Sequence, residues 1–249
     1  MKISSFLLLL ASIFIIILAW YLLTDVWGVR SIFLPSPQAT FTKWLSLLTT
    51  GTFWLDVKAS TYRVLMGFLF SFAVAYPLVI GSLINRNIKE VVFYQVEFFR
   101  YLPIPVFIPL TVLWFGVDDA GKLMVVFLGT FAQMIPMFYD SSMLLNRRYD
   151  AFIHALKWSR WKYIKNVIIP GAAPHVLDNA RLCFGWAWTY LIIAELMGAD
   201  HGIGYAIIRA QRTLNTDTIF AYILTIGIIG ICTDRLMFYL KKQLFQWHT

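Results

Sequence analysis

Long apolar runs separated by short polar stretches recur along the whole chain. A helix needs about 20 mostly apolar residues to cross the hydrocarbon core of a bilayer. Runs of this kind lie at about 3–23, 59–84, 91–115, 121–145, 174–196 and 219–240. The pattern predicts an all-α membrane protein of about six transmembrane helices. We expect one transmembrane domain over residues 1–249, with its core at about 59–240.

A secretory signal peptide is the alternative interpretation of the first run, residues 3–23. The apolar part of a signal is about 7–15 residues long and is followed by a cleavage site of small residues. This run is longer, and no such site follows it. We therefore expect a retained N-terminal helix.

Composition supports the membrane interpretation. Hydrophobic residues make up 59% of the chain and charged residues 14%, against roughly 45–50% and about 25% in soluble domains. This hydrophobicity excludes a disordered chain, and a count of 2 cysteines excludes a disulfide scaffold. The net charge of +8 fits basic inner loops better than a nucleic-acid partner.

The basic residues also predict an orientation, because Lys and Arg accumulate in the cytoplasmic loops of membrane proteins. With the N-terminus inside, the inner segments hold 12 of these residues and the outer segments hold 7. We therefore expect both termini to be cytoplasmic.

Two connecting segments fall on the outer side in this arrangement. Residues 24–58 form a long connection with a weakly amphipathic piece at about 41–48, which we expect to lie on the membrane surface. Residues 198–218 read as a second outer loop, rich in glycine and polar residues.

The main inner segment spans residues 146–170. Its apolar and basic positions over 149–168 suit short amphipathic helices, and we expect these to end at Pro170, ahead of Gly171 and Pro174. A basic segment of this kind either rests on anionic lipid headgroups or docks a cytoplasmic partner through its aromatic residues. The pattern alone leaves both interpretations open.

Charged residues within the spans are expected to face protein or water rather than lipid. Glu97 and Arg100, and likewise Asp178 and Arg181, are three residues apart and are predicted to pair across one helical turn.

Glu195 has no such neighbour. We expect it to have a structural role at the outer end of its span, or to meet Arg209 or Arg212.

Three prolines, Pro103, Pro105 and Pro109, interrupt the third span. Each removes a backbone donor and distorts the helix. The freed carbonyls need partners in protein or in a water-lined cavity. We therefore expect this span to lie beside a solute path rather than against lipid.

No catalytic motif is present. The chain has no GxSxG, HExxH or Walker A sequence. Its histidines are scattered without metal-ligand spacing, and Cys183 and Cys232 fall in apolar spans, where thiols act as small apolar groups. We expect no catalytic residue, no metal site and no bound cofactor in this chain.

The order of several short pieces resembles the permease subunit of an ATP-binding-cassette importer, in the nitrate, taurine and aliphatic-sulfonate branch of the binding-protein-dependent inner-membrane components. The matching pieces are LPSP at 34–37, STYRVLMGF at 60–68, FRYLPIPVFIPLTVLWFG at 99–116, LKWSRWKYIKNVIIPGAAPHVL at 156–177, RLCFGWAWTYLIIAELMGADHGIGY at 181–205 and QLFQW at 243–247.

In that family an inner loop forms coupling helices that sit in a groove of the ATPase. The resemblance implies this role for eight residues: Asp150, Ala151, Ala155, Leu156, Lys157, Ser159, Arg160 and Trp161. The sequence departs from the family pattern at Lys157, where a glycine usually follows the leucine. It also departs at the acidic position, which is Ala151 or, one residue earlier, Asp150.

The resemblance further implies a solute path near the third and fifth spans. The candidate path residues are Arg100, Pro103, Pro105, Trp186, Tyr190 and Glu195. An anionic solute would be helped by positive potential from Arg100 and Arg181, unless both are neutralised by their neighbours.

The implied protein is a non-enzymatic permease of a bacterial inner membrane, working by ATP-driven alternating access. Its implied partners are a second permease copy, two ATPase subunits that hold ATP and Mg, and a soluble or lipid-anchored binding protein. The implied solute is a small anion or small organic molecule, such as nitrate, a sulfonate, bicarbonate or a thiamine precursor.

Two other functions are weighed against this one. An ion-driven secondary transporter predicts inverted repeats with broken helices at matching positions. A membrane-embedded enzyme predicts clustered His, Asp, Glu or Cys at the membrane face. We find neither pattern in the sequence.

Overall fold

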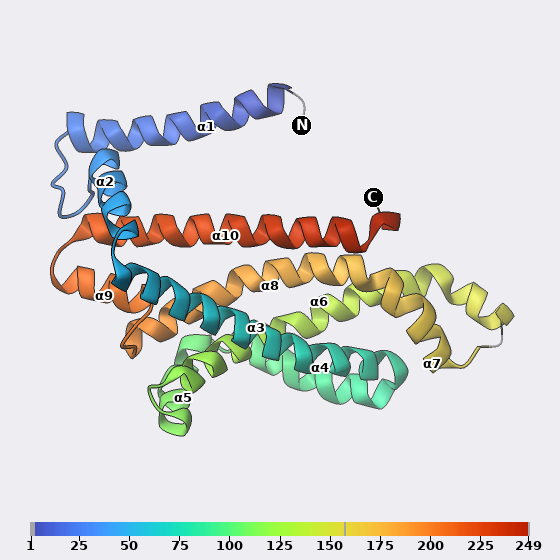
Figure 1. The fold of residues 1–249 in the computed structure, drawn as a ribbon. Coiled ribbons are helices and arrows are strands. Elements are labelled where there is room, and N and C mark those ends of the chain that lie inside the picture. The colour runs from blue at the N-terminus through green and yellow to red at the C-terminus, as the bar shows by residue number, and fades with distance from the viewer. Residues whose placement is uncertain (1–2, 157, 249) are drawn as a thin grey trace. The chain divides into compact units, whose positions relative to one another are not determined.

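The computed structural model describes the backbone of residues 3–156 and 158–248. Side chains are described over the same ranges except at 3–6, 9, 146–156, 197 and 248. Throughout these ranges the ordered elements are helices, without a strand (Figure 1).

In chain order they are α1 (Ile3–Tyr21), η1 (Leu22–Val26), α2 (Pro37–Leu48), α3 (Gly51–Ile84), α4 (Arg86–Arg100), η2 (Ile104–Phe107), α5 (Ile108–Phe115), α6 (Asp119–Leu156), α7 (Arg160–Tyr163), η3 (Ile164–Ile168), α8 (Ile169–Met197), α9 (Ile203–Arg212), α10 (Thr216–Leu244) and η4 (Gln246–His248).

Each predicted span falls on a helical segment. Among the described helices, α3, α6 up to Leu145, and α10 are each long and apolar enough to cross a membrane. The helices α4 and α5 form an apolar pair bent by 94° at the break between them, which is where the prolines predicted an interruption. The predicted all-α membrane fold is confirmed.

Two helices extend beyond the predicted spans, and one predicted boundary is wrong. The helix α3 begins at Gly51 rather than near residue 59, and α6 continues to Leu156. The inner segment does not end at Pro170, because α8 begins at Ile169 and runs through both Pro170 and Pro174. Pro170 is tolerated because it lies in the first turn of α8, where the amide it lacks would have no intrahelical partner, whereas Pro174 lies inside the helix.

The chain forms two compact units. One consists of Met1–Lys58 with Asp200–Ile229, and the other of Ala59–Ala199 with Gly230–Thr249.

In the first unit, a buried carboxylate organises a helix that the sequence analysis treated as a loop. Asp56 accepts hydrogen bonds from the backbone amide of Gly202 at 2.9 Å and from the hydroxyl of Tyr222 at 3.0 Å. Gly202 has a φ of 135° and stands directly before α9. Asp56 therefore binds the N-terminus of α9, where helix amides lack partners.

In the second unit, small residues let α3, α6 and α8 approach closely. A Cβ atom built on Gly129 would lie 2.2 Å from the Tyr190 ring, and one on Gly67 would lie 2.7 Å from Val126. Polar side chains join the same helices: Thr130 donates to the Ser71 hydroxyl at 2.6 Å. Close approach and interhelical hydrogen bonds of this kind drive helix association in membranes.

Gly129→Ala tests this packing. The new methyl group would meet the Tyr190 ring near its attachment point, where the side chain has little room to move. We expect a loss of about 1–3 kcal/mol in unfolding free energy, measured by denaturing the detergent-solubilised protein. The matched control is Gly185→Ala on α8, where a Cβ would meet nothing within 4 Å. Equal stability of the two variants would contradict the packing argument.

Candidate functional site: an exposed turn and a buried ion cluster

A short helical turn follows the C-terminal end of α6. Ser159 caps α7, because its hydroxyl accepts a hydrogen bond from the Lys162 amide at 3.4 Å. Trp161 in this turn is 51% exposed, whereas Tyr163 and Ile164 directly after it are buried. The turn therefore exposes the Trp161 side chain, while the two residues Tyr163 and Ile164 pack against the protein.

Arg160 fastens this turn to the end of another helix. Its Nε donates to the carbonyl of Leu83 at 2.9 Å. Leu83 lies in the last turn of α3, where carbonyls lack intrahelical partners and a cation is favourable. In addition, the Lys162 ammonium lies 4.8 Å from the centre of the Trp158 ring. The exposed turn is thus tied to α3, and it continues through η3 into α8.

The length of α6 is consistent with a segment that extends beyond a bilayer. It has 38 residues, which at a rise of 1.5 Å per residue is about 57 Å, whereas the hydrocarbon core of a bilayer is about 30 Å thick. Of the predicted coupling residues, Ser159, Arg160 and Trp161 are described. The side chains of Asp150, Ala151, Ala155 and Leu156, and the whole of Lys157, lie outside the described residues.

A buried ion cluster joins α3, α6 and α8. The Arg63 guanidinium donates through Nη1 to Glu195 at 2.7 Å and through Nε to Asp119 at 2.6 Å. Ser60 completes the cluster, with its hydroxyl 2.8 Å from both oxygens of the Glu195 carboxylate. The Glu195 side chain has no exposed surface and that of Arg63 is 7% exposed, whereas that of Asp119, at the edge of the cluster, is 51% exposed.

The partner of Glu195 differs from the predicted one. The sequence analysis named Arg209 and Arg212, which follow Glu195 in the chain, and did not consider Arg63 as a partner. Arg63 lies inside α3, within the span predicted at about 59–84. The structural role expected for Glu195 is consistent with its contacts. Its partner was missed because the two residues are 132 positions apart.

A second ion network links α8 with the C-terminal part of α10. Arg181 donates to both carboxylate oxygens of Asp234, at 2.7 and 2.9 Å, and Lys241 donates to Asp178 at 2.5 Å. The predicted pair of Asp178 and Arg181 is present at 3.6 Å. It is one longer contact in a four-residue network rather than an isolated pair.

The other predicted local pair is absent. Glu97 and Arg100 are both described, and the structure shows no ion pair between them. Both side chains are exposed on α4.

The predicted path residues divide into two groups. Arg100, Pro103, Pro105 and Trp186 are exposed, whereas Glu195 is buried. Tyr190 is half-buried, lies over Gly129 and packs beside the buried Ile108. The structure therefore brings Tyr190 and Glu195 into helix packing. Within the described ranges, no three His, Cys, Asp or Glu side chains are grouped so that they could hold a metal ion.

Arg63→Met tests the buried cluster. Removing the cation would leave the buried Glu195 without the charge of Arg63, and breaking a buried ion pair typically costs about 3–5 kcal/mol. We expect a loss of that size in unfolding free energy in detergent, and part of it should return in the Arg63→Met, Glu195→Gln double variant.

The matched control for this test is Arg86→Met. The Arg86–Glu90 pair has an exposed arginine side chain, at 85%, and such pairs contribute at most about 1 kcal/mol. A similar loss in the two single variants would mean that burial of the cluster does not matter.

Comparison with known proteins identifies relatives over most of the chain. The family described as binding-protein-dependent transport system inner membrane component matches residues 67–246. A probable ABC transporter permease protein of Brucella melitensis is 33% identical over 230 residues, which cover 92% of this chain and 92% of that protein.

Two further comparisons extend this result. The putative aliphatic sulfonates transport permease protein SsuC of Bacillus subtilis is 28% identical over 233 residues, covering 94% of this chain and 84% of that protein. An inward-facing structure of the MetNI methionine ABC transporter matches with a TM-score of 0.65 and 15% identity, covering 79% of this chain and 97% of the matched chain. At that identity, the structural match shows the fold alone.

Proposed function

This chain belongs to the binding-protein-dependent transport system inner membrane component family, and from that membership we propose that it forms the solute path of an importer driven by a separate ATPase. It is a permease subunit of an ATP-binding-cassette transporter in an inner membrane, and the family implies ATPase and substrate-binding protein partners. The alternative, ion-driven secondary transport, has no support from this family.

The observation that carries the mechanism is the exposed Trp161 on a turn that is fastened to the membrane helices. Large aromatic side chains are the residues that most often anchor protein interfaces. Motion of a bound ATPase would be transmitted through Arg160 to the end of α3, and through the buried Tyr163 and Ile164 toward α8. This supports the role of residues 150–161 in coupling.

The ion cluster determines which helices would move together. Because Arg63 joins α3 to both α6 and α8, these helices are held together at the end opposite the turn. We propose that the three helices tilt as one body when the ATPases close. That movement would expose the solute path on one side of the membrane and then on the other.

We propose the following assembly. Two copies of this chain form the path, two ATPase subunits that hold ATP and Mg dock beneath it, and a binding protein delivers solute from outside. Both termini lie in the cytoplasm, as the excess of basic residues in the inner segments supports. This chain itself binds no cofactor and breaks no bond.

The proposed solute is a small anion or a small organic molecule. The relative from Bacillus subtilis is named for aliphatic sulfonates, which supports an anionic class. The described ion pairs neutralise Arg181 through Asp234 and Asp178. Arg100, which is exposed and has no ion pair with Glu97, is then the better candidate for positive potential along the path.

Trp161→Ala tests the coupling role. We expect the variant to insert normally but to bind the ATPase about thirty-fold more weakly and to retain correspondingly less of it on affinity purification, because interface anchors of this kind typically contribute about 2 kcal/mol or more. The matched control is Trp27→Ala, at a tryptophan that is 76% exposed in the segment before α2. Normal ATPase recovery with Trp161→Ala would contradict the assignment.

A second experiment tests the solute class. The purified permease–ATPase complex is reconstituted with its binding protein, and ATP hydrolysis is measured with nitrate, an alkyl sulfonate, bicarbonate and a thiamine-precursor pyrimidine. We expect one of the anions to stimulate hydrolysis, and only when the binding protein is present. Stimulation by the pyrimidine alone would exclude the anionic class while leaving the transporter assignment intact.

A further inference from the structure

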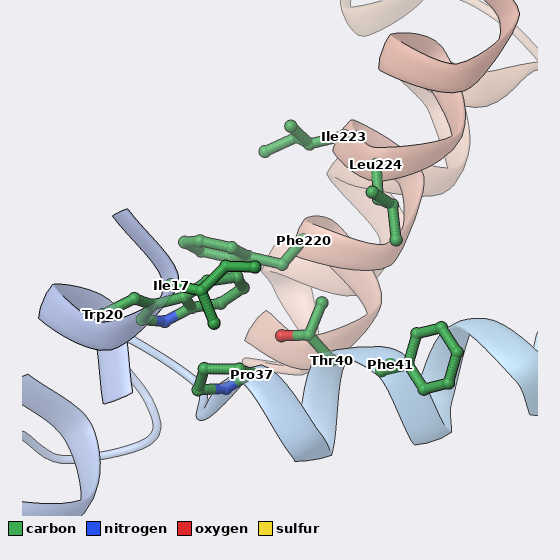
Figure 2. A pocket seen from close by; sticks show the side chains of 8 residues that line it. All are labelled: Ile17, Trp20, Pro37, Thr40, Phe41, Phe220, Ile223 and Leu224. Carbon is green, nitrogen blue, oxygen red and sulfur yellow. The ribbon is translucent and has the colours of Figure 1, made fainter. Parts of the chain in front are cut away.

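The first unit contains an apolar hollow bordered by α1, α2 and α10. It encloses about 390 Å³, which is within the range of pockets that bind small ligands. Six of the side chains that line it are those of Ile17, Trp20, Thr40, Phe220, Ile223 and Leu224. Figure 2 shows these side chains converging from the three helices on one space.

Beside this hollow, one polar atom lacks a partner within the described part of the chain. Trp20 has already used its indole N–H, which donates to the Pro35 carbonyl at 2.8 Å. Thr40 is only 4% exposed, and its hydroxyl has no hydrogen-bond partner among the described residues. Figure 2 shows this hydroxyl turned toward the side of the hollow formed by α1. Buried hydroxyl groups are almost always hydrogen-bonded. A bound molecule that carries an acceptor would therefore satisfy the Thr40 hydroxyl.

A second hollow of about 400 Å³ adjoins the first along α1. The two share Ile17, Pro37 and Phe41, and the second adds Phe14 and Leu18. Both Phe14 and Leu18 are exposed apolar side chains. The two hollows together offer an elongated apolar surface beside Thr40.

The position of the hollow along α10 indicates its depth in a bilayer. The helix begins at Thr216, so Phe220 and Leu224 lie roughly 6–12 Å along its axis. The amphipathic helix α2 forms the adjoining wall. The hollow therefore lies near the boundary between the hydrocarbon core and the polar interface. In a phospholipid the ester carbonyls are found at that boundary.

We propose that this hollow binds an acyl chain of a membrane phospholipid, with the Thr40 hydroxyl donating a hydrogen bond to the ester carbonyl of that chain. The methylene groups lie between Trp20, Phe220 and Ile223 and continue along α1. A second copy of this chain is a poorer occupant. A packed helix from another subunit uses its backbone carbonyls internally and would leave the Thr40 hydroxyl without an acceptor.

The test is native mass spectrometry of the purified permease–ATPase complex, supplied with equal amounts of a diacyl phosphatidylethanolamine and its dialkyl ether analogue. The ether lipid has the same headgroup and chains but no carbonyl. We expect the wild-type complex to retain the diacyl lipid about five-fold better, as one hydrogen bond accounts for. Thr40→Val, which preserves shape and removes the hydroxyl, should abolish the preference.

A filling variant and a matched control separate this site from general lipid contact. Ile223→Trp should displace both lipids, whereas Ile231→Trp, at an exposed isoleucine of the same helix that does not line the hollow, should behave as wild type. Retention by Ile223→Trp equal to that of Ile231→Trp would overturn the proposal, as would an equal preference in wild type and Thr40→Val.

The occupant is distinguished from a second copy by cross-linking. We expect Ile223→Cys not to form a disulfide between two chains under oxidation. Rapid disulfide formation together with unchanged lipid retention would mean that another subunit covers the hollow, and the lipid proposal would be wrong. None of these outcomes depends on which solute is transported, so they leave the proposed transport function untouched.

Discussion

Placement of the Arg63 guanidinium inside a membrane helix is the constraint on which the second unit depends. A cation in this setting is tolerated only when protein groups replace its water, and here Glu195 and Asp119 do so at 2.7 and 2.6 Å. Because these carboxylates come from α8 and α6, the ion pairs fix three helices to one another. Small residues such as Gly129 then permit the close packing that the ion pairs require.

The same three helices lead to the exposed turn at the other end. Arg160 caps the C-terminus of α3, and η3 joins the turn to α8. In the proposed mechanism, a force applied at Trp161 would be carried to helices that share one polar core. In the proposed assembly this chain supplies a rigid connection, and the separate ATPase subunits supply the chemistry.

The sequence predicted the elements well because hydrophobic periodicity and run length depend on the bilayer, which acts on every span alike. The predictions were wrong where a residue's interaction partner is far from it in the sequence. The sequence analysis treated α9 as a loop. The N-terminus of this helix is bound by Asp56, and because the bonded residues Asp56 and Gly202 are 146 positions apart, the contact leaves no local pattern in the sequence. The true partner of Glu195 was missed for the same reason, and Asp178 and Arg181 found additional partners on α10.

Proline gave both a correct and an incorrect prediction. The break before Pro103 was foreseen, since three prolines close together disrupt a span. Pro170 was expected to end a helix and instead begins one, because its effect depends on whether it stands in the first turn or the interior. The motif pieces around Trp161 predicted the location of the turn, but its anchor on Leu83 lies 77 residues away from Arg160 and left no signal in the sequence.

The most direct measurement of the central claim is solute uptake into sealed vesicles that carry this chain, with and without the ATPase subunits. The account predicts accumulation only when the ATPase, ATP and the binding protein are all present. Accumulation by this chain alone, driven by an ion gradient across the vesicle membrane, would contradict it.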